Sequence, residues 1–326
     1  MPIPDRFIET LIQAQRLLLV AHVSPDGDTL GSGLALRLAF LALGKEATLV
    51  CQDPVPALYH FLPGADTVKT PEEMSGMEAF DTALAVDVSD RLRLGGCESV
   101  FEACPQRLVL DHHGTNDHFG QENWIEAEAS ATGVLALALC RALGAPVNGD
   151  IALCLYTAIS TDTGHFQFAN TTPEAMHAAA DLVAAGVDVA DVTARLYREM
   201  PRAKTALLAC ALGRLAFAHE GRTAYITLRR SDFDACGAGD EMTEGIINYA
   251  IQTQGVEAAF LATERAEGVK FSVRSKAPFD AAALCRQFGG GGHTLAAGCR
   301  MMCPIDEAAN VMLDAIAQSR KESGRA

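Results

Sequence analysis

The first half of the chain alternates short apolar runs with longer apolar segments of helical spacing, and this alternation constrains the fold more than any other feature. The strand-like runs are LLLV (17–20), ATLVC (47–51), TALAVDVS (82–89) and RLVLDHH (107–113). Between the first two, LGSGLALRLAFLALG (30–44) carries leucines at roughly helical spacing and stops at a glycine. Strands that alternate with helices predict an α/β fold, in which a parallel sheet has helices on both faces.

The strand pattern lapses where the polar helical stretch AAGVDVADVTARLYREMPRAK (184–204) begins. Three further strand-like runs follow it: TAYITL, VEAAFLAT and VKFSVRS. At 326 residues the chain also exceeds the ~250 to 300 residues at which a single core stops growing. We therefore predict an N-terminal parallel-sheet domain over 1–185, a helical linker over 186–205 and a smaller α/β domain over 206–326.

The net charge restricts the class of partner. Lysine and arginine total 26, and aspartate and glutamate total 41, so the formal charge is −15. A chain of this charge repels a long polyanion unless its basic residues are gathered locally. We therefore expect no binding of long duplex DNA, whereas a short nucleotide held in a small cationic pocket agrees with the composition.

Two further features concern the cellular compartment. The ten cysteines include no C-x-x-C pair and most lie in apolar segments, which favours buried thiols over a zinc site or disulfides. No apolar run approaches the ~20 residues that span a bilayer. The N-terminal segment MPIPDRFIETLIQAQR lacks the pattern of a signal peptide. We expect a protein of the cytoplasm without a membrane partner.

Ionisable side chains gather where the predicted elements end. Four segments supply them: His22, Asp26, Asp28, Asp87, Asp111, His112, His113 and Asp162. Each has a structural alternative, since Asp28 could be a helix N-cap, Asp87 could end a strand and a lone histidine is often structural. As a set they favour a functional site, because several carboxylates packed together are costly unless cations neutralise them.

The residue types indicate which cations. Carboxylates mixed with imidazoles suit hard to borderline divalent ions, with Mn²⁺ the best compromise and Mg²⁺ or Co²⁺ as substitutes. The donors are too many for one ion and fit two metals roughly 3.5 to 4 Å apart, bridged by a carboxylate and a water. Such a pair is typical of phosphoryl or acyl hydrolysis.

The motifs around these residues resemble the DHH phosphoesterase family. DHHGTN (111–116) stands with H-x-x-x-D-x-D (22–28), VDVSD (86–90) and STDTG (160–164), which are the four family motifs in family order. FGGGGHTLAAG at 288 to 298, preceded by VRS, looks like the DHH-associated C-terminal domain. The compact length most resembles the branch of nano-RNases (oligoribonucleases) and phosphatases of 3′-phosphoadenosine 5′-phosphate (pAp). The resemblance implies a catalytic N-terminal domain and an active site in the cleft between the two domains.

The resemblance also implies a role for each motif residue. The metal ligands would be His22, Asp26, Asp28, Asp87, His112 and Asp162, with Asp87 bridging the two ions. Asp111 would orient a ligand histidine. His113 would face the substrate and donate to a phosphoryl oxygen or to the departing oxygen.

The glycine run of the second domain has a physical interpretation of its own. Gly289 to Gly292 lack Cβ atoms, so backbone N–H groups can close around an anion, and His293 follows at once. Arg274 adds a guanidinium that matches phosphate geometry. We predict a phosphate-binding site at Arg274, Gly290, Gly291, Gly292 and His293, and leave the roles of Arg286 and His165 open.

The resemblance implies exonucleolytic hydrolysis of short oligoribonucleotides and removal of the 3′-phosphate of pAp. The alternative is a phosphodiesterase of cyclic or linear dinucleotide second messengers, such as cyclic di-AMP or pApA. A manganese inorganic pyrophosphatase and a non-catalytic nucleotide sensor are less favoured, because the GGGGH segment and every catalytic position are present. The polarity of attack does not follow from the sequence, and a homodimer is one assembly that it allows.

Overall fold

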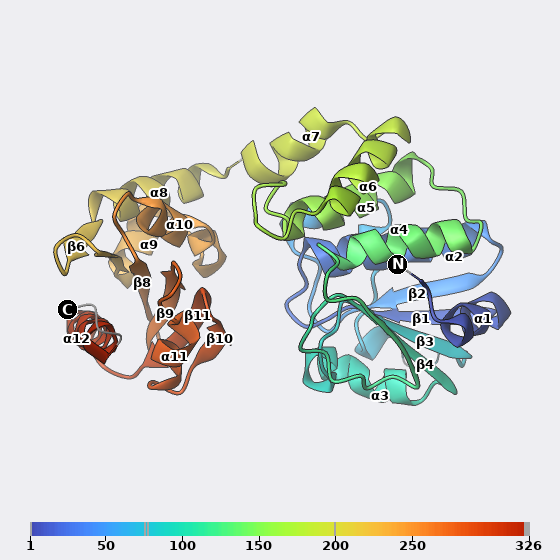
Figure 1. Cartoon of the computed structure of the whole chain (residues 1–326), viewed down its shortest axis with the longest axis horizontal. Coiled ribbons are helices and arrows are strands. Elements are labelled where there is room, and N and C mark those ends of the chain that lie inside the picture. Colours follow the sequence, from blue (N-terminus) through green and yellow to red (C-terminus); the bar gives the residue numbers. More distant parts are fainter. Residues whose placement is uncertain (1, 75, 77, 199, 323–326) are drawn as a thin grey trace. The chain divides into compact units, whose positions relative to one another are not determined.

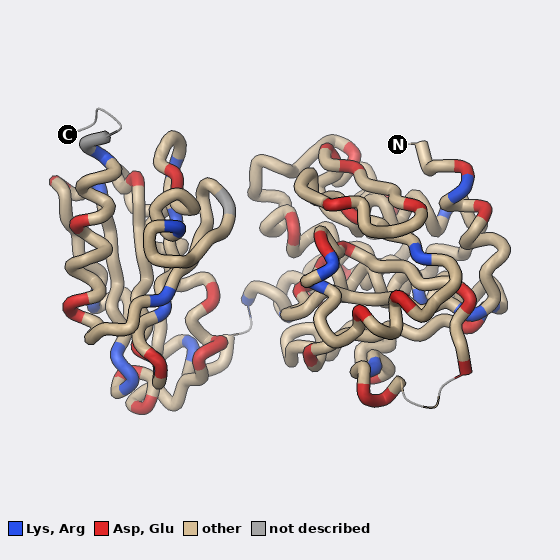
Figure 2. Tube along the Cα trace, turned by 90° about the horizontal axis from the view of Figure 1, so that it is seen from below, with Lys and Arg blue, Asp and Glu red and all other residues tan. Residues whose placement is uncertain are grey.

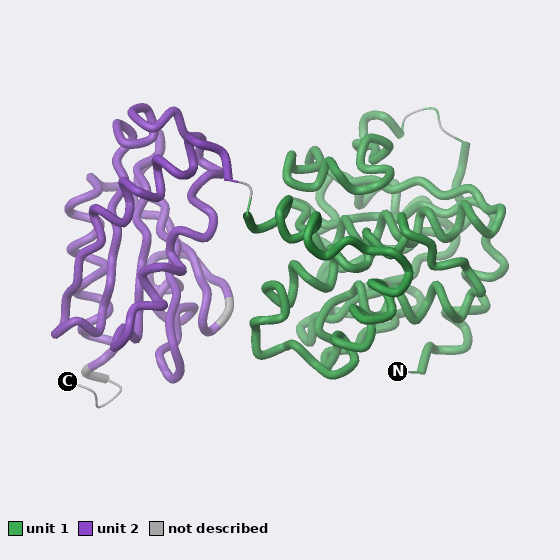
Figure 3. The backbone as a smooth tube through the Cα atoms, turned by 90° about the horizontal axis from the view of Figure 1, so that it is seen from above, with its two compact units in different colours: residues 1–198 green, residues 199–326 purple. Residues whose placement is uncertain are grey.

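The computed structural model describes residues 2–74, 76, 78–198 and 200–322, without the side chains of residues 293, 321 and 322. It divides into two compact units, Met1–Arg198 and Glu199–Ala326 (Figure 3). The division falls inside the stretch 186–205 that the sequence predicts as a linker. Each unit is described by itself below.

The N-terminal unit is built on a five-stranded sheet with strand order β2-β1-β3-β4-β5, and every adjacent pair is parallel. The strands are β1 (Arg16–Val20), β2 (Glu46–Val50), β3 (Thr82–Val86), β4 (Gln106–Asp111) and β5 (Glu122–Ile125). The residues of β3 are all buried, as the apolar composition of a parallel strand requires. The predicted parallel sheet is confirmed.

Helices cover both faces of this sheet (Figure 1). The longer ones are α1 (Asp5–Gln13), α2 (Gly27–Ala42), α4 (Thr132–Ala142), α5 (Gly149–Asp162) and α6 (Pro173–Ala184), and the shorter ones are α3 (Glu98–Glu102) and α7 (Val189–Thr193). Alternate strand residues divide between two cores: Leu17 and Leu19 face α2, α4 and α5, whereas Leu18 and Val20 face α3. Helices α2 and α5 approach so closely that a Cβ on Gly31 would lie 2.5 Å from the Cys154 carbonyl oxygen.

The C-terminal unit has a six-stranded sheet of order β10-β11-β9-β8-β7-β6, in which β7 and β8 are parallel and the other neighbours antiparallel. Its strands are β6 (Ala216–Ala218), β7 (Thr223–Leu228), β8 (Ala258–Arg265), β9 (Gly268–Ser275), β10 (Gly291–His293) and β11 (Ala296–Met301). Its helices are α8 (Arg202–Gly213), α9 (Arg230–Cys236), α10 (Ile246–Gln252), α11 (Ala281–Arg286) and α12 (Ile305–Glu322). The predicted smaller α/β domain is confirmed.

The sheet of this unit also separates two cores. Phe260 and Phe271 pack with residues of α11 and α12, whereas Ala259 and Leu261 pack with residues of α8, α9 and α10. Within the described residues, no helix is long and apolar enough to cross a membrane. The ten cysteines are free thiols and most are buried.

Candidate metal centre

The sequence-predicted metal ligands meet at the carboxyl edge of the N-terminal sheet. Strands β1, β3 and β4 are parallel neighbours, so the residues that follow them reach the same edge. His22 follows β1, Asp87 follows β3, and Asp111 is the last residue of β4. The N-terminal end of α2 adds Asp26 and Asp28, and the C-terminal end of α5 adds Asp162.

The first group of donors surrounds the Nε2 atom of His22. This nitrogen lies 3.6 Å from Oδ2 of Asp26 and 3.5 Å from Oδ2 of Asp87. One donor atom of each residue lies within 4.8 Å of the other two, which is the spacing of a potential cation site. His22 and Asp87 are buried, whereas Asp26 is exposed at the edge of the group.

The second group surrounds the Nε2 atom of His112. This atom is 3.8 Å from Oδ2 of Asp28 and 3.6 Å from Oδ2 of Asp162. It is also 3.7 Å from Oδ1 of Asp87, the oxygen that does not face His22. Asp87 therefore presents one oxygen to each group, as a bridging carboxylate must.

Backbone and hydroxyl donors hold the buried carboxylates in place. Asp28 accepts hydrogen bonds from the backbone N–H groups of Thr132 and Gly133, at 2.7 and 2.9 Å, and from the Ser32 hydroxyl at 3.0 Å. The hydroxyl of Thr132 donates to Oδ1 of Asp87 at 2.9 Å. The first turn of α4 thus fixes both carboxylates. Sequence reasoning missed Thr132, because nothing local to residue 132 indicates contacts with residues 28 and 87.

The N-cap of α2 differs from the structural alternative that the sequence left open. Asp26, rather than Asp28, caps this helix, accepting from the backbone N–H groups of Asp28 and Thr29 at 3.0 and 3.2 Å. The side chain of Asp28 instead points to α4 and to the donor group around His112. The capping alternative for Asp28 is therefore wrong.

The two histidines that face the carboxylates are oriented through their other ring nitrogen. Nδ1 of His22 is 2.8 Å from the Val23 carbonyl oxygen, and Nδ1 of His112 is 3.1 Å from the Ala129 carbonyl oxygen. A proton on each Nδ1 would donate to these carbonyls and leave Nε2 with its lone pair toward the carboxylates. Both rings therefore have the orientation that a metal ligand needs.

Asp111 orients His113 rather than the predicted ligand His112. The fully buried Asp111 carboxylate is 2.8 Å from Nδ1 of His113, and it also accepts from the side-chain amide of Asn116 at 2.6 Å. Its only bond to His112 is from the backbone N–H. The hydrogen bond to Asp111 raises the pKa of His113 although burial opposes the rise. For the pKa of Asp111, burial acts upward and is outweighed by His113 and Asn116, so the pKa is lowered.

Burial and neighbouring charges shift the pKa values of several members of the donor cluster, which consists of His22, Asp26, Asp28, Asp87, His112 and Asp162. Burial, followed by the charges of Asp87 and Asp162, raises the pKa of Asp28 well above its usual value. Burial is also the main cause that raises the pKa of Asp162 to about 6. For His22, burial lowers the pKa, but hydrogen bonds and charge from Asp26 and Asp87 outweigh it and raise the pKa to about 9. The donor set fits divalent cations, which would neutralise this excess of negative charge.

The glycine run of the C-terminal unit forms a strand edge rather than an open loop. Gly291 and Gly292 pair in β10 with residues of β11, and the amides of Gly289 and Gly290 already donate to the carbonyls of Arg286 and Cys285. A Cβ on Gly290 would lie 2.2 Å from the Gly298 carbonyl oxygen. The prediction that the four amides close around an anion is therefore wrong for the first two glycines, because their amides are occupied.

Strand pairing places Arg274 near the glycine run. It lies in β9 opposite Ala296 of β11, and its guanidinium donates to the carbonyl oxygen of Val273 at 3.1 Å. No carboxylate pairs with it among the described side chains, and burial lowers its pKa. The side chain of His293 lies outside the described residues.

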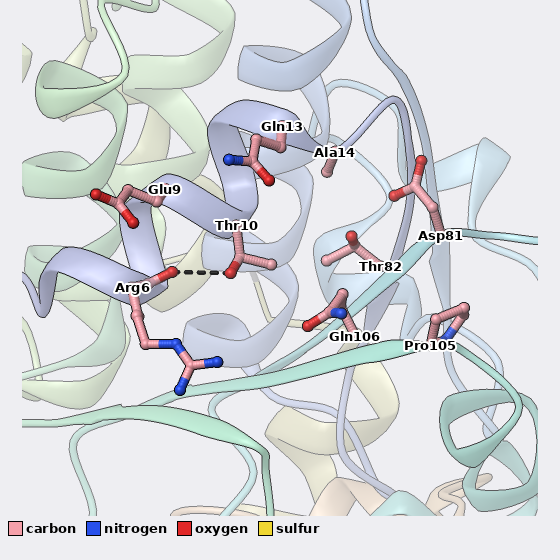
Figure 4. Close-up of a pocket in the computed structure, with 9 residues that line it drawn as sticks. All are labelled: Arg6, Glu9, Thr10, Gln13, Ala14, Asp81, Thr82, Pro105 and Gln106. Atoms are coloured by element: carbon pink, nitrogen blue, oxygen red, sulfur yellow. Dashed lines mark hydrogen bonds between the residues drawn. The ribbon is translucent and has the colours of Figure 1, made fainter.

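A pocket of about 470 Å³ lies at the opposite edge of the N-terminal sheet (Figure 4). It is lined by α1 and by the beginnings of β3 and β4: Arg6, Glu9, Thr10, Gln13, Ala14, Asp81, Thr82, Pro105 and Gln106. Thr82 and Gln106 are the first residues of their strands, so the pocket and the donor cluster lie at opposite ends of the same strands. None of the predicted site residues lines it.

Two family models match the chain. Residues 16–159 match the N-terminal domain of the DHH family, and residues 234–321 match the DHHA1 domain. The first match covers three of the four N-terminal motifs and ends just before STDTG (160–164), and the second match covers VRS and the glycine run.

The chain is also similar to two curated relatives and to one solved structure. It is 34% identical over 309 residues to the bifunctional oligoribonuclease and PAP phosphatase NrnA of Thermus thermophilus, an alignment that covers 94% of this chain and 91% of that protein. It is 24% identical over 317 residues to NrnA of Bacillus subtilis, which covers 94% and 96%. The fold matches the crystal structure of an exopolyphosphatase-related protein from Bacteroides fragilis with a TM-score of 0.91 at 24% identity, covering 97% and 96% of the two chains.

Proposed function

Because this chain belongs to the DHH family, we propose that it is a metal-dependent phosphoesterase that cleaves short oligoribonucleotides exonucleolytically and removes the 3′-phosphate of pAp. The observation that carries the proposal is the convergence of six imidazole and carboxylate donors on one sheet edge. The names of the relatives from Thermus thermophilus and Bacillus subtilis support the choice of substrates. We further propose that the enzyme acts in the cytoplasm.

The residues present fit two divalent cations. His22, Asp26 and Asp87 would hold one, and Asp28, Asp87, His112 and Asp162 would hold the other. We propose Mn²⁺ as the resident ion because imidazole and carboxylate donors are mixed, with Mg²⁺ or Co²⁺ as substitutes. Such ions, when bound, supply an activated water and positive charge for the phosphoryl oxygens.

The chain's own contribution to catalysis centres on His113. The Nδ1–H of His113 donates a hydrogen bond to Asp111, which stabilises the charged ring and turns Nε2 away from the Asp111 carboxylate. Its side chain is 28% exposed, so the ring is accessible to a ligand. We propose that Nε2 donates to an oxygen of the phosphoryl group under attack or to the departing oxygen. Asn116 holds Asp111 through a second hydrogen bond.

We propose that the C-terminal unit binds a phosphate of the substrate other than the one that is cleaved. Arg274 is the main candidate, because its guanidinium has no carboxylate partner among the described side chains and lies opposite β11. Gly290, Gly291, Gly292 and His293 remain predicted members of this phosphate site. Of the three glycines, Gly291 would contribute by leaving space beside the strand edge, because a Cβ there would meet no atom within 4 Å, whereas the Gly290 amide is already bonded.

A substrate panel tests the proposed function. The Mn²⁺-loaded protein is offered pAp, RNAs of two to five nucleotides, pApA, cyclic di-AMP and pyrophosphate, and initial rates are compared. We expect the highest kcat/KM for pAp and the short RNAs. A preference for cyclic di-AMP or pApA would favour the second-messenger phosphodiesterase, and a preference for pyrophosphate would contradict the proposed branch of the family. The molar mass of the same sample in solution decides whether the enzyme is a homodimer.

A further inference from the structure

We infer that Arg93 is a substrate-binding residue of the metal centre, and that it contacts the phosphoryl group under attack once a cation occupies the site beside His22. The inference rests on the proposed phosphoesterase function and adds a residue that lies outside the sequence motifs used above. Arg93 belongs to the short 3-10 segment Arg91–Cys97, which follows β3.

The backbone of Arg93 is tied to the loop that carries His22. Its N–H group donates to the Asp90 side chain at 3.1 Å, and its carbonyl oxygen accepts from the N–H of Val23 at 2.9 Å. Gly95 continues the segment with φ 54° and ψ −135°, and a Cβ there would lie 2.4 Å from a methyl group of Val23. The segment is therefore held against the loop after β1, which places the arginine beside the donor cluster.

The side chain of Arg93 has an unusual environment for a cation in an acidic protein. Its Nη2 atom is 3.0 Å from Nδ1 of His22. No aspartate or glutamate pairs with it among the described side chains, whereas its neighbour Arg91 pairs with Glu102 at 2.6 Å. Within the described part of the chain, Arg93 is the lysine or arginine that hydrogen-bonds to a proposed metal ligand. Arg93 is thus a half-buried cation without an acidic partner at the edge of the site.

The contact with His22 gives Arg93 no hydrogen-bond acceptor when Nδ1 of that ring carries a proton. A guanidinium can only donate, so the contact requires a lone pair on Nδ1 of His22. A cation on Nε2 requires the proton on Nδ1, where it donates to the Val23 carbonyl oxygen at 2.8 Å. Arg93 then needs another acceptor, and a phosphoryl oxygen matches the planar fork of its N–H groups.

Measuring the affinity for a nucleotide distinguishes a substrate-binding role of Arg93 from a merely structural role. The probe is AMP, titrated calorimetrically into the Mn²⁺-loaded protein, with Mn²⁺ stoichiometry measured on the same sample. We expect Arg93→Ala to weaken AMP binding about 10- to 100-fold, the usual loss for a hydrogen bond to a charged group. Mn²⁺ content should stay unchanged. Arg93→Lys should recover part of the affinity, because it restores the charge but not the fork.

Arg91→Ala is the matched control, since it removes an exposed arginine of the same segment that pairs with Glu102. It should bind AMP like the wild type. Equal AMP affinity in Arg93→Ala and Arg91→Ala would overturn the inference, and so would a loss of Mn²⁺ from Arg93→Ala, which would assign Arg93 to positioning His22. If Arg93→Ala does not melt like the wild type, Arg93→Gln replaces it in the same comparison.

A small diester keeps this test independent of the proposed substrates. Bis-p-nitrophenyl phosphate offers only the reacting phosphate, so Arg93→Ala should lower its kcat/KM about 10-fold or more. If the wild type cleaves the diester but none of the nucleotides, the proposed substrates fail while the diester still decides the role of Arg93. An unchanged kcat/KM for the diester in Arg93→Ala would count against contact with the reacting phosphate.

Discussion

The two units of this protein differ sharply in charge. Residues 1–198 contain 11 lysines and arginines and 26 aspartates and glutamates, so their formal charge is 11 − 26 = −15. Residues 199–326 contain 15 of each kind, so their formal charge is 15 − 15 = 0. The whole excess charge of the chain therefore lies in the unit that carries the donor cluster, and Figure 2 shows acidic positions distributed along that unit.

This difference in charge indicates that the two units have different roles in substrate binding. The N-terminal unit repels phosphate until cations neutralise its buried carboxylates. In the C-terminal unit eight of the 15 acidic residues pair with arginines, such as Asp306 with Arg229 and Asp240 with Arg230. Arg274 is outside these pairs. We therefore expect changes in the first unit to affect every substrate, and changes around Arg274 to affect only substrates with a second phosphate.

The largest effect should follow Asp87→Ala. Asp87 directs one oxygen toward each donor group, and no neighbouring side chain can replace both oxygens. We expect almost no activity on any substrate and fewer than two Mn²⁺ per chain by metal analysis. Asp150→Ala, an exposed acid in the first turn of α5, serves as the control and should behave like the wild type. Full Mn²⁺ occupancy with normal turnover would show that Asp87 is not the bridge.

The second largest effect should follow His113→Ala, which tests whether hydrolysis depends on a hydrogen-bond donor beside the metal ions. We expect kcat to fall by about 10² to 10³ on nucleotides and on the small diester alike, the usual cost of removing one charge-stabilising donor. Mn²⁺ content should remain near two per chain, because His113 is not among the six proposed ligands. If the variant loses an ion instead, the roles of His112 and His113 are exchanged.

The third effect tests the second unit. Arg274→Ala combined with His293→Ala should raise KM strongly and lower kcat for pAp and dinucleotides, because lost positioning also reduces rate. Activity on bis-p-nitrophenyl phosphate should stay within a few-fold, since this diester has no second phosphate. Arg300→Ala, which removes an exposed arginine of β11 paired with Glu267, is the control. Equal losses of activity on both substrate types, with fold and metal content unchanged, would contradict the proposal that the second unit acts only on substrates with a second phosphate.

The smallest effect is a pH dependence confined to the first unit. The pKa of His22 is raised to about 9, so in the metal-free protein its protonated form stabilises the fold fully below pH 6.5, and this stabilisation is lost as pH rises through 9. The affinity for a cation instead increases as the pH rises, because the proton on Nε2 of His22 must leave before a cation binds there. We expect Mn²⁺ affinity to fall about tenfold per pH unit below 9.

Calorimetry in buffers of different ionisation enthalpy measures this proton release directly. At least one proton should be released per metal-loaded chain near pH 7.5, because the pKa values of both His22 and Asp28 are raised, with more below pH 6, where Asp162 is also protonated. Mn²⁺ affinity that does not change between pH 6.5 and 8.5 would contradict the assignment of His22 as a ligand.

Much of the candidate site could be predicted from the sequence because the chemistry lies at the ends of regular elements. Apolar runs of strand length indicated β1, β3 and β4, and parallel neighbours must bring their carboxyl ends to one edge. The ionisable residues directly after these runs could therefore be grouped before their distances were known. The same reasoning gave Asp162, since it ends the helix α5.

The sequence by itself thus determined the parallel sheet and the composition of the donor cluster, since both follow from short-range patterns and the geometry of parallel strands. Only the tertiary structure decided how those donors are held. Thr132 reaches Asp28 and Asp87 across 104 and 45 positions of the chain, and Arg93 reaches His22 across 71. Local sequence patterns do not predict such contacts, because the contacts depend on how separate loops pack at one edge of the sheet. The pairing of Gly291 and Gly292 with β11 could not be predicted from the sequence for the same reason.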